Sequence, residues 1–597
     1  MRLSRLLSHT ACALALLAPA VATAQRRPAL NEYGNPPRLA PAPTTSAITV
    51  RDLQLRLYQF ADDSMHGRQV GRVGNMKGTA YIAAELKRLG LVPAGDNGTF
   101  FQVLPYHLRH FTSHSRLAVS GNPLEWERDW VAVPGLRAPR PVLGAEVVFG
   151  GVAGDTTRQI PASEAAGKFV VLLPDPSAAS RGAGAPAARF APPPPSRFAS
   201  AAAVATVDLD ALTIAQRRAI NTPTVATQSM PGRGRPGATP ATDSISLLRQ
   251  QLEQLAPQAT IRLTQAAAAR LFGVQSVEAL QPGTRGGTVN ASLDFVELPT
   301  DYARNVVALI PGSDPALRGQ YVALGAHNDH VGFSTPVDRD SLKAFNDERN
   351  RRLLAKQMVA LTPAELAAIR VNMDSIRKRF PVPRIDSINN GADDDGSGSM
   401  ALLEIAEYVQ AMPVKPKRST LFVWHTGEEA GLVGSAYFTR TPTVPLDSIV
   451  AQLNIDMIGR GREGDLPGGS PDYLGVVGSF FDSKDLGETV AQVNRRQGRP
   501  LALDYQYDST MTWTGYNNIY GRSDHYNYAL QGIPIAFFFT GLHGDYHQRT
   551  DEPEFIDYPH YHRITTYIRD VALAVANGPR PRLNGTRPAR PPRPTVP

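Results

Sequence analysis

The chain has 597 residues, of which 42% are hydrophobic and 19% charged, and its formal net charge is +8. This length exceeds what one hydrophobic core supports, so we expect two globular domains with appendages. Without the seven arginines of its two ends the charge is +1, and no basic stripe is interleaved with aromatic residues. A nucleic-acid partner is therefore not expected.

The N-terminus has the pattern of an export signal. Arg2 and Arg5 precede an apolar run over residues 11–21, and the small-residue site Ala22-Thr23-Ala24 follows. We expect residues 1–24 to be a signal peptide. The run is too short for a permanent membrane anchor and no later run is longer, so the protein is predicted to be exported, to the periplasm or beyond, without a stable anchor.

Cys12 is the only cysteine and lies inside the predicted signal. The mature chain is therefore expected to contain no disulfide, no cysteine nucleophile and no thiolate zinc site. Any metal site must be built from His, Asp and Glu side chains.

A Pro-rich leader over residues 25–47 precedes an N-terminal segment, residues 48–137, that we expect to pack on a larger domain. Helical spacing of apolar residues predicts helices over 49–61 and 75–89, the second ending at Gly90.

The next region, residues 138–296, has the pattern of a smaller β-rich α+β domain. Short apolar runs at 146–151, 167–173 and 259–263 predict buried strands, and an Ala-rich helix follows the last. The stretch 175–243 is rich in Ala, Pro, Gly and Arg without periodicity, so part of it is expected to be mobile.

Residues 297–576 alternate apolar strands with helical patterns. The strand candidates are continuous apolar runs, at 305–310, 321–326, 420–424, 449–455 and 533–539. A helix is predicted over 400–412 with Ser399 as its N-cap. This pattern predicts an α/β fold in which helices sandwich a mixed, mostly parallel sheet.

A charged segment, residues 341–380, interrupts this alternation. It is predicted to form two helices, the second opened by a capping box at Thr362 and Glu365 with Pro363 between them. The Pro/Arg-rich tail, residues 577–597, is predicted to be disordered.

The run Asn390-Gly391-Ala392-Asp393-Asp394-Asp395-Gly396-Ser397-Gly398 places three consecutive carboxylates between glycines. Like charges this close disfavour ionisation unless a cation lies among them, so the run suggests a divalent metal. The alternative is a solvated acidic turn, which Asp, Gly and Ser also favour.

Four of the predicted strands end in residues that can bind metals. The segments are His327-Asn328-Asp329, His425-Thr426-Gly427-Glu428-Glu429, Asp456, and His543-Gly544-Asp545-Tyr546-His547. Sites in open α/β sheets form at the carboxyl ends of strands, so these segments and the acidic run are expected to meet in one crevice. Each alone is weak evidence, because a lone histidine is more often structural and a glutamate pair more often solvated.

Together these segments resemble the M28 family of zinc peptidases over about residues 301–576. The motifs that carry the resemblance are Gly325-Ala326-His327-Asn328-Asp329, Gly391-Ala392-Asp393-Asp394-Asp395, Glu428-Glu429-Ala430-Gly431-Leu432-Val433-Gly434-Ser435, Asn454-Ile455-Asp456-Met457 and Tyr546-His547. The related M20 peptidases share the ligand order, but the residues of the motifs at 391–395 and 428–435 are similar to those of M28. The resemblance implies a zinc-exopeptidase fold.

The resemblance also implies two Zn²⁺ ions per chain. His327 and Asp456 would complete one zinc site, Glu429 and His547 the other, and Asp394 would bridge both. Asp393 and Asp395 would shape the turn instead of binding metal.

Three more residues receive roles from the resemblance. Glu428 would be the general base, held beside the metals by its neighbour Glu429. Asp329 would accept the second N–H of the His327 imidazole. Tyr546 would donate to the oxyanion, although a tyrosine beside a ligand can also serve only packing.

Other histidines are not expected to bind metal, since the five ligand positions are filled. His330 and His425 are assigned supporting or structural roles, and His543 a place in a loop. The segment Arg522-Ser523-Asp524-His525 resembles a family loop near the site, but it is equally consistent with a turn that positions neighbouring strands. Residues 138–296 are similar to the protease-associated (PA) domains inserted before M28 catalytic domains, and the insert 341–380 is expected on the rim of the crevice.

The function predicted from these residues is an exported zinc exopeptidase, an aminopeptidase, that cleaves peptides or proteins with a metal-activated water. The alternatives are a carboxypeptidase or dipeptidase of the same fold, a receptor-like binding protein without catalysis, and a glutaminyl-cyclase-type acyltransferase, which typically uses one zinc. The sequence predicts no oligomeric state.

Overall fold

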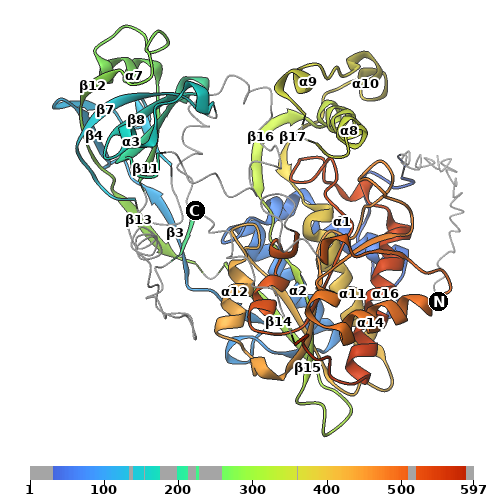
Figure 1. The fold of residues 1–597 in the computed structure, drawn as a ribbon. Helices are drawn as coiled ribbons and strands as arrows, with labels where there is room; N and C mark the ends of the chain where they lie inside the picture. Colours follow the sequence, from blue (N-terminus) through green and yellow to red (C-terminus); the bar gives the residue numbers. More distant parts are fainter. Residues whose placement is uncertain are drawn as a thin grey trace, which may run out of the picture.

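The structure is a computed structural model that describes residues 31, 33–133, 139–153, 155–174, 198–212, 224–227, 258–300, 302–359, 361–508 and 519–585. Figure 1 shows a β-rich unit, residues 106–299, beside a larger α/β body built from residues 33–103 and 302–585. The predicted signal peptide lies outside the described residues.

A nine-stranded sheet forms the centre of the α/β body. Its four middle strands are parallel to one another and are ordered β18 (Ser419–His425), β15 (Tyr321–His327), β19 (Ile449–Ile455) and β22 (Ile535–Phe539). Apart from the half-buried Tyr321, all residues of these strands are buried, as their continuous apolar runs predict. Because the four strands are parallel, their carboxyl ends meet at one edge.

The outer strands make the sheet mixed, with the predicted parallel arrangement confined to the middle strands and to one outer pair. On one side β14 (Arg304–Ile310) is antiparallel to β18, and β1 (Val92–Pro93) and β2 (Phe101–Val103) are antiparallel to β14. On the other side β20 (Tyr473–Val477) is antiparallel to β22, and β21 (Ala502–Asp504) is parallel to β20.

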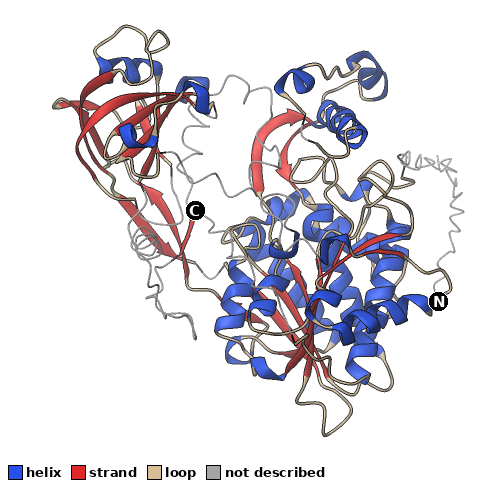
Figure 2. Ribbon diagram, viewed as in Figure 1, coloured by secondary structure: helices blue, strands red, loops and turns tan. Residues whose placement is uncertain are grey.

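Helices cover both faces of this sheet (Figure 2). One face packs on α1 (Val50–Phe60), α2 (Val73–Leu89), α11 (Gly398–Ala411), α14 (Lys484–Arg495) and α16 (Tyr558–Asn577). The other packs on α12 (Val433–Arg440) and α15 (His525–Leu530). Along β14, Val306 and Ala308 face the first group and Val307 the second, so a buried strand supplies apolar residues to two cores.

Helix α11 begins at Gly398, and its N-cap is Ser397 without a side-chain cap bond. The prediction that Ser399 caps this helix is wrong. The hydroxyl of Ser399 instead donates to the carbonyl oxygen of His327. The acidic turn runs directly into the helix, so no separate cap is required.

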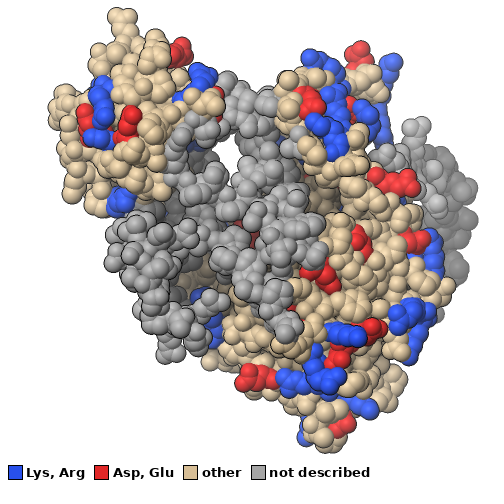
Figure 3. All heavy atoms as spheres, in the orientation of Figure 1, with Lys and Arg blue, Asp and Glu red and all other residues tan. Residues whose placement is uncertain are grey.

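The charged insert is carried by a two-stranded arm of β16 (Gly332–Asp338) and β17 (Ile385–Asn389). It contains three helices where two were predicted: α8 (Arg339–Ala355), α9 (Pro363–Ala367) and α10 (Met373–Arg379). The capping box of Thr362 and Glu365 is present at the start of α9. On the face drawn in Figure 3, lysine and arginine side chains gather over this insert with acidic side chains among them.

The β-rich unit contains an eight-stranded and a three-stranded sheet. The first has the order β5 (Asn122–Leu124), β4 (Arg116–Val119), β12 (Arg285–Ser292), β7 (Val142–Val152), β8 (Phe169–Leu173), β9 (Ala203–Val207), β11 (Ala259–Leu263), β6 (Trp130–Ala132). Helix α7 (Gln265–Phe272) packs on it. The second has the order β10 (Thr224–Thr227), β3 (Tyr106–Phe111), β13 (Phe295–Pro299).

Two features of this unit differ from the sequence pattern. Strands β4 to β6 precede residue 137, yet they pair in the β-rich sheet because Leu117, Val119 and Trp130 complete its core. Strand β9 lies within the low-complexity stretch, where alternating small residues hide its period. The similarity to PA domains stays a prediction.

Most of the low-complexity stretch, predicted to be partly mobile, lies outside the described residues. Most of the tail, predicted to be disordered, also lies outside them. Residues 578–585 are described, and Asn584 Nδ2 donates to the carbonyl oxygens of Phe480 and Phe481. Among the described helices, none combines the length and apolar character needed to cross a bilayer.

Candidate metal centre

The acidic turn η5 (Ala392–Ser397) lies at the strand-end edge of the sheet and is tied to it by its two outer carboxylates. Asp395 accepts the backbone N–H of His327 at 2.9 Å and of Met457 at 3.2 Å. Asp393 accepts the N–H of Gly459 at 2.6 Å. These two side chains therefore bind the turn to the ends of β15 and β19, which leaves the middle carboxylate, Asp394, for another role.

Gly391 opens the turn with a φ of +54°. A Cβ at this position would lie 2.2 Å from the carbonyl oxygen of Asp394 and 2.5 Å from Cγ of His330. Only glycine fits this close approach of the backbone to the centre.

Two residues that the sequence analysis did not single out hold the turn from outside. The carboxylate of Asp551 accepts the backbone N–H groups of Asp393 and Asp394 at 3.0 to 3.1 Å. The buried guanidinium of Arg68 donates to the carbonyl oxygens of Asn390 and Gly391 at 2.7 and 2.9 Å. The N-terminal segment thus helps to shape a site formed mainly by residues after 325.

We expect Arg68→Met to destabilise the protein strongly. Its guanidinium also donates to the carbonyl oxygen of Phe60 at 2.9 Å, so the change leaves three buried acceptors without this donor. A loss of about 3 kcal/mol follows from the cost of unsatisfied buried acceptors. The thermal unfolding midpoint measures it, and exposed Arg51→Met is the control, expected to change stability by less than about 0.5 kcal/mol. Equal midpoints for the two variants would contradict the role of Arg68.

A first group of possible metal donors joins His327, Asp394 and Asp456, all buried. Nε2 of His327 lies 3.1 Å from Oδ1 of Asp394 and 3.6 Å from Oδ1 of Asp456. The other oxygen of Asp456 accepts a hydrogen bond from Ser523 at 2.7 Å, which fixes the carboxylate. Ser523, which lies just before α15, thus positions a residue of this group.

The second nitrogen of His327, Nδ1, lies 3.0 Å from the backbone carbonyl oxygen of Asp329 and 3.8 Å from its carboxylate. A carbonyl oxygen accepts only from N–H, so Nδ1 carries the proton and Nε2 presents its lone pair to the group. The backbone carbonyl of Asp329 therefore orients the ring, whereas the sequence analysis expects the Asp329 side chain to do so. The Asp329 carboxylate instead accepts the N–H of Glu428 at 3.1 Å, and burial raises its pKa to about 7.

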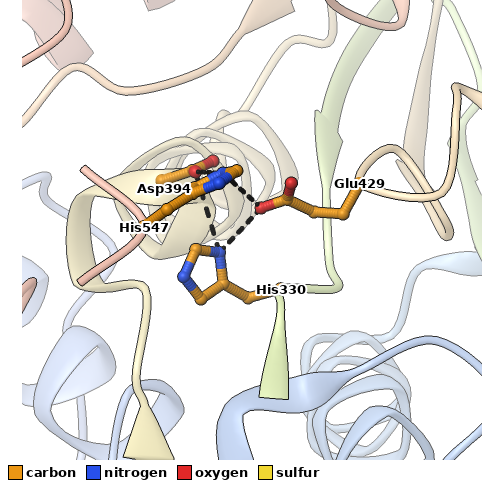
Figure 4. A group of neighbouring side chains, drawn as sticks. All are labelled: His330, Asp394, Glu429 and His547. Carbon is orange, nitrogen blue, oxygen red and sulfur yellow. Dashed lines mark ion pairs between the residues drawn. The ribbon is translucent and has the colours of Figure 1, made fainter. Parts of the chain in front are cut away.

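A second group joins His330, Asp394, Glu429 and His547, whose donor atoms all lie within 4.8 Å of one another (Figure 4). Nε2 of His547 lies 2.8 Å from Oδ2 of Asp394 and 2.9 Å from Oε1 of Glu429. Nδ1 of His330 lies 2.9 Å from that oxygen of Glu429 and 3.7 Å from that oxygen of Asp394. The structure thus brings together all five predicted ligands in two groups and adds His330.

Asp394 belongs to both groups through different oxygens. Oδ1 faces His327 and Oδ2 faces His547. A carboxylate in this arrangement can bind one cation with each oxygen, so the geometry fits a bridging ligand.

The charges of the second group favour a cation among its donors. Burial alone would lower the pKa of His547, but the carboxylates of Glu429 and Asp394 raise it to about 9. Burial alone would raise the pKa of Glu429, but His547 and His330 lower it to about 2. Because nearby carboxylates favour positive charge here, and because imidazole and carboxylate donors suit zinc, the residues fit a zinc centre.

Glu428 borders the cavity beside the first group. The cavity is also lined by Asp394, Asp456 and Tyr546, and its remaining lining is Met457, Ile519, Arg522, Ser523, Phe537, Phe539 and Leu542. Burial raises the pKa of Glu428 well above its usual value. The carboxylate therefore lies where a group bound in the cavity would meet it, and it belongs to neither donor group.

Tyr546 lies on the same cavity. Its ring stacks on His547 at a centroid distance of 3.9 Å, and its hydroxyl accepts a hydrogen bond from Arg522 at 3.4 Å. Burial raises the pKa of Tyr546 well above its usual value, so the hydroxyl stays protonated and can donate.

The loop that carries Tyr546 and His547 is held by the charged insert. From α8, Asn346 Nδ2 donates to Thr550 Oγ1 at 3.0 Å and Arg349 donates to the carbonyl oxygen of Gly544 at 2.6 Å. Lys343 lies 3.2 Å from the carboxylate of Asp545. The insert therefore lies against the loop of a metal-donor residue.

The remaining buried histidines near the site lie outside both donor groups. His425 Nε2 lies 3.0 Å from the hydroxyl of Tyr528, and His525 Nε2 lies 2.8 Å from the carbonyl oxygen of Tyr520. His543 Nε2 lies 3.3 Å from a carboxylate oxygen of Asp393.

The second half of the chain is similar to known peptidases. Residues 305–572 match the model described as Peptidase family M28. Leupeptin-inactivating enzyme 1 of Streptomyces exfoliatus is 31% identical over 160 residues, which is 26% of this chain and 31% of that protein. An aminopeptidase of Pseudomonas aeruginosa is 33% identical over 166 residues, 26% of each chain. The chain thus spans about a third or less of the length of these relatives.

Solved structures resemble the chain over most of its length. A zinc aminopeptidase from Bacillus subtilis covers 89% of this chain and 96% of its own, at 15% identity and a TM-score of 0.46. The aminopeptidase from Aneurinibacillus sp. strain AM-1 covers 90% and 95%, at 16% identity and a TM-score of 0.43.

Proposed function

We propose that this chain, whose residues 305–572 match the model of peptidase family M28, is a two-zinc exopeptidase that acts as an aminopeptidase. The observation that carries the proposal is Asp394, whose two oxygens face two separate donor groups beside the cavity that holds Glu428. A peptide bond bound in this cavity would meet Asp394, Asp456 and the glutamate.

When bound, the zinc ions would polarise the scissile carbonyl and make a water molecule more acidic. Glu428 would take the proton of that water and return it to the leaving amine. The Tyr546 hydroxyl would donate a hydrogen bond to the carbonyl oxygen as negative charge develops there. Asp329 would hold the Glu428 backbone in place through its carboxylate.

The aminopeptidase assignment rests on the relatives and on the cavity. The Pseudomonas aeruginosa relative is named an aminopeptidase, and probable leucine aminopeptidase 2 of Aspergillus oryzae is 33% identical over 159 residues, 26% of this chain and 28% of that protein. Apolar side chains line part of the cavity, which suits an uncharged terminal residue. Export through the 1–24 signal and a PA-like role for residues 138–296 belong to the same proposal.

The test combines zinc analysis with peptides blocked at either end. We expect two zinc ions per chain and cleavage of a leucyl peptide whose C-terminus is amidated, with no cleavage after its N-terminus is acetylated. Cleavage that needs a free C-terminus would indicate a carboxypeptidase, and cleavage that needs both free ends a dipeptidase. One zinc with cyclisation of an N-terminal glutamine would indicate the cyclase type, and no zinc with no cleavage a binding protein.

A further inference from the structure

The two donor groups differ in how many protein atoms they offer. The group of His327 has three donors, and two of its members, Asp394 and Asp456, line the cavity. The second group has four donors, and of these only the shared Asp394 borders the cavity. Closed four-donor sites are typical of structural zinc, and open three-donor sites of catalytic zinc.

We propose that His330 is a zinc ligand through Nδ1, so that the two ions are unequal: one is held by four protein donors and fills first, and the other faces the substrate. This inference rests on the proposed two-zinc function. It adds a second imidazole to the site of Glu429 and His547.

The position of the His330 ring supports ligation. Tetrahedral zinc with donors at about 2.0 to 2.1 Å places the donors about 3.3 Å apart. Nδ1 of His330 lies 2.9 and 3.7 Å from the same two oxygens, of Glu429 and Asp394, that face Nε2 of His547. Both imidazoles thus converge on one point between two carboxylates.

The bonding of the His330 ring points the same way. The ring is fully buried, and within the described part of the chain neither of its nitrogens makes a hydrogen bond of good geometry. Oε1 of Glu429 and Oδ2 of Asp394, the two oxygens that it faces, also lack one. Buried polar atoms seldom remain in this state, and a cation between them satisfies Nδ1 of His330 and the two carboxylate oxygens.

The ring is also held in place from behind. Gly391 approaches so closely that a Cβ there would lie 2.5 Å from Cγ of His330. The backbone N–H of His330 donates to the carbonyl oxygen of Arg68 at 3.2 Å. The turn and the N-terminal segment therefore fix the donor before any metal arrives, as a preorganised ligand requires.

The test uses the full-length chain, stripped of metal and loaded with one equivalent of zinc. X-ray absorption of this form counts imidazole ligands without any mutation. We expect two imidazoles at the first ion, from His330 and His547, and calorimetry should resolve two steps of unequal affinity.

Variants locate the effect. His330→Gln should weaken the first step by about 100-fold or more, since even supporting residues around a metal cost 10- to 100-fold. His525→Gln, which alters a buried histidine outside both groups, should leave both steps within about threefold of the wild type.

A single imidazole at the first ion overturns the inference, and so do two equal steps or a first step that His330→Gln leaves unchanged. A chain that binds two zinc ions in this way still satisfies the proposed function. A wild-type chain that binds no zinc overturns both.

Discussion

Glu428→Gln is expected to keep both zinc ions and to lower kcat by about 10²- to 10⁴-fold, the usual contribution of a general base. The carboxylate of Glu428 borders the cavity and belongs to neither donor group, so its loss removes a proton acceptor without removing a ligand. Glutamine has nearly the same shape but accepts no proton at neutral pH. Zinc analysis and steady-state kinetics on a leucyl peptide measure the two quantities together.

The control for this variant is Glu463→Gln, which removes a carboxylate from an exposed position. It should match the wild type in both zinc content and kcat. A near-normal kcat for Glu428→Gln would refute the general-base role, and a loss of zinc would mean that Glu428 is a ligand.

Asp394→Asn should abolish the paired centre. Each carboxylate oxygen of Asp394 faces a different donor group. An asparagine amide replaces one of these oxygens with an NH₂ group, and that NH₂ group cannot bind a cation. We expect no more than one zinc ion per chain, bound at least about 100-fold more weakly, and no measurable peptidase activity. Zinc titration of the metal-free variant checks this.

The neighbouring Asp395→Asn is the matched control. The Asp395 carboxylate accepts backbone N–H groups of His327, Gly398 and Met457, so its change should lower the unfolding midpoint while two zinc ions still bind. If Asp395→Asn loses zinc and Asp394→Asn retains it, the bridge has been assigned to the wrong carboxylate.

The strand ends of the site could be predicted because the physics is local and repetitive. Continuous apolar runs identify buried parallel strands, and parallel strands bring His327, Asp456 and the loop of His547 to one edge. The role of Asp394 needed the resemblance, since three equal carboxylates in a row do not tell which one faces the metal.

The supporting residues could not be predicted in this way. Arg68 and Asp551 act on the turn through tertiary contacts, and in the sequence they look like an ordinary loop arginine and aspartate. His330 is three residues from His327, and only the path of the chain after β15 turns its ring into the other group. The sequence does carry one signal for this residue: a second histidine, His330, stands three positions after the ligand candidate His327. The sequence analysis gives it a supporting role.

The order of the donors along the chain determines when zinc can act during folding. Along the chain, His327 ends β15, the first of the four central parallel strands, and His547 follows β22, the last strand of the sheet. The first group is complete only when β19 has brought Asp456 to the edge, and the second only when the loop after β22 has brought His547. We therefore expect zinc to bind the formed sheet and not to nucleate it. Zinc then stabilises by mass action on the native state alone, by about 4 kcal/mol for an ion at a thousandfold excess over its Kd. We therefore expect the free energy of unfolding to rise with the free zinc of the surroundings.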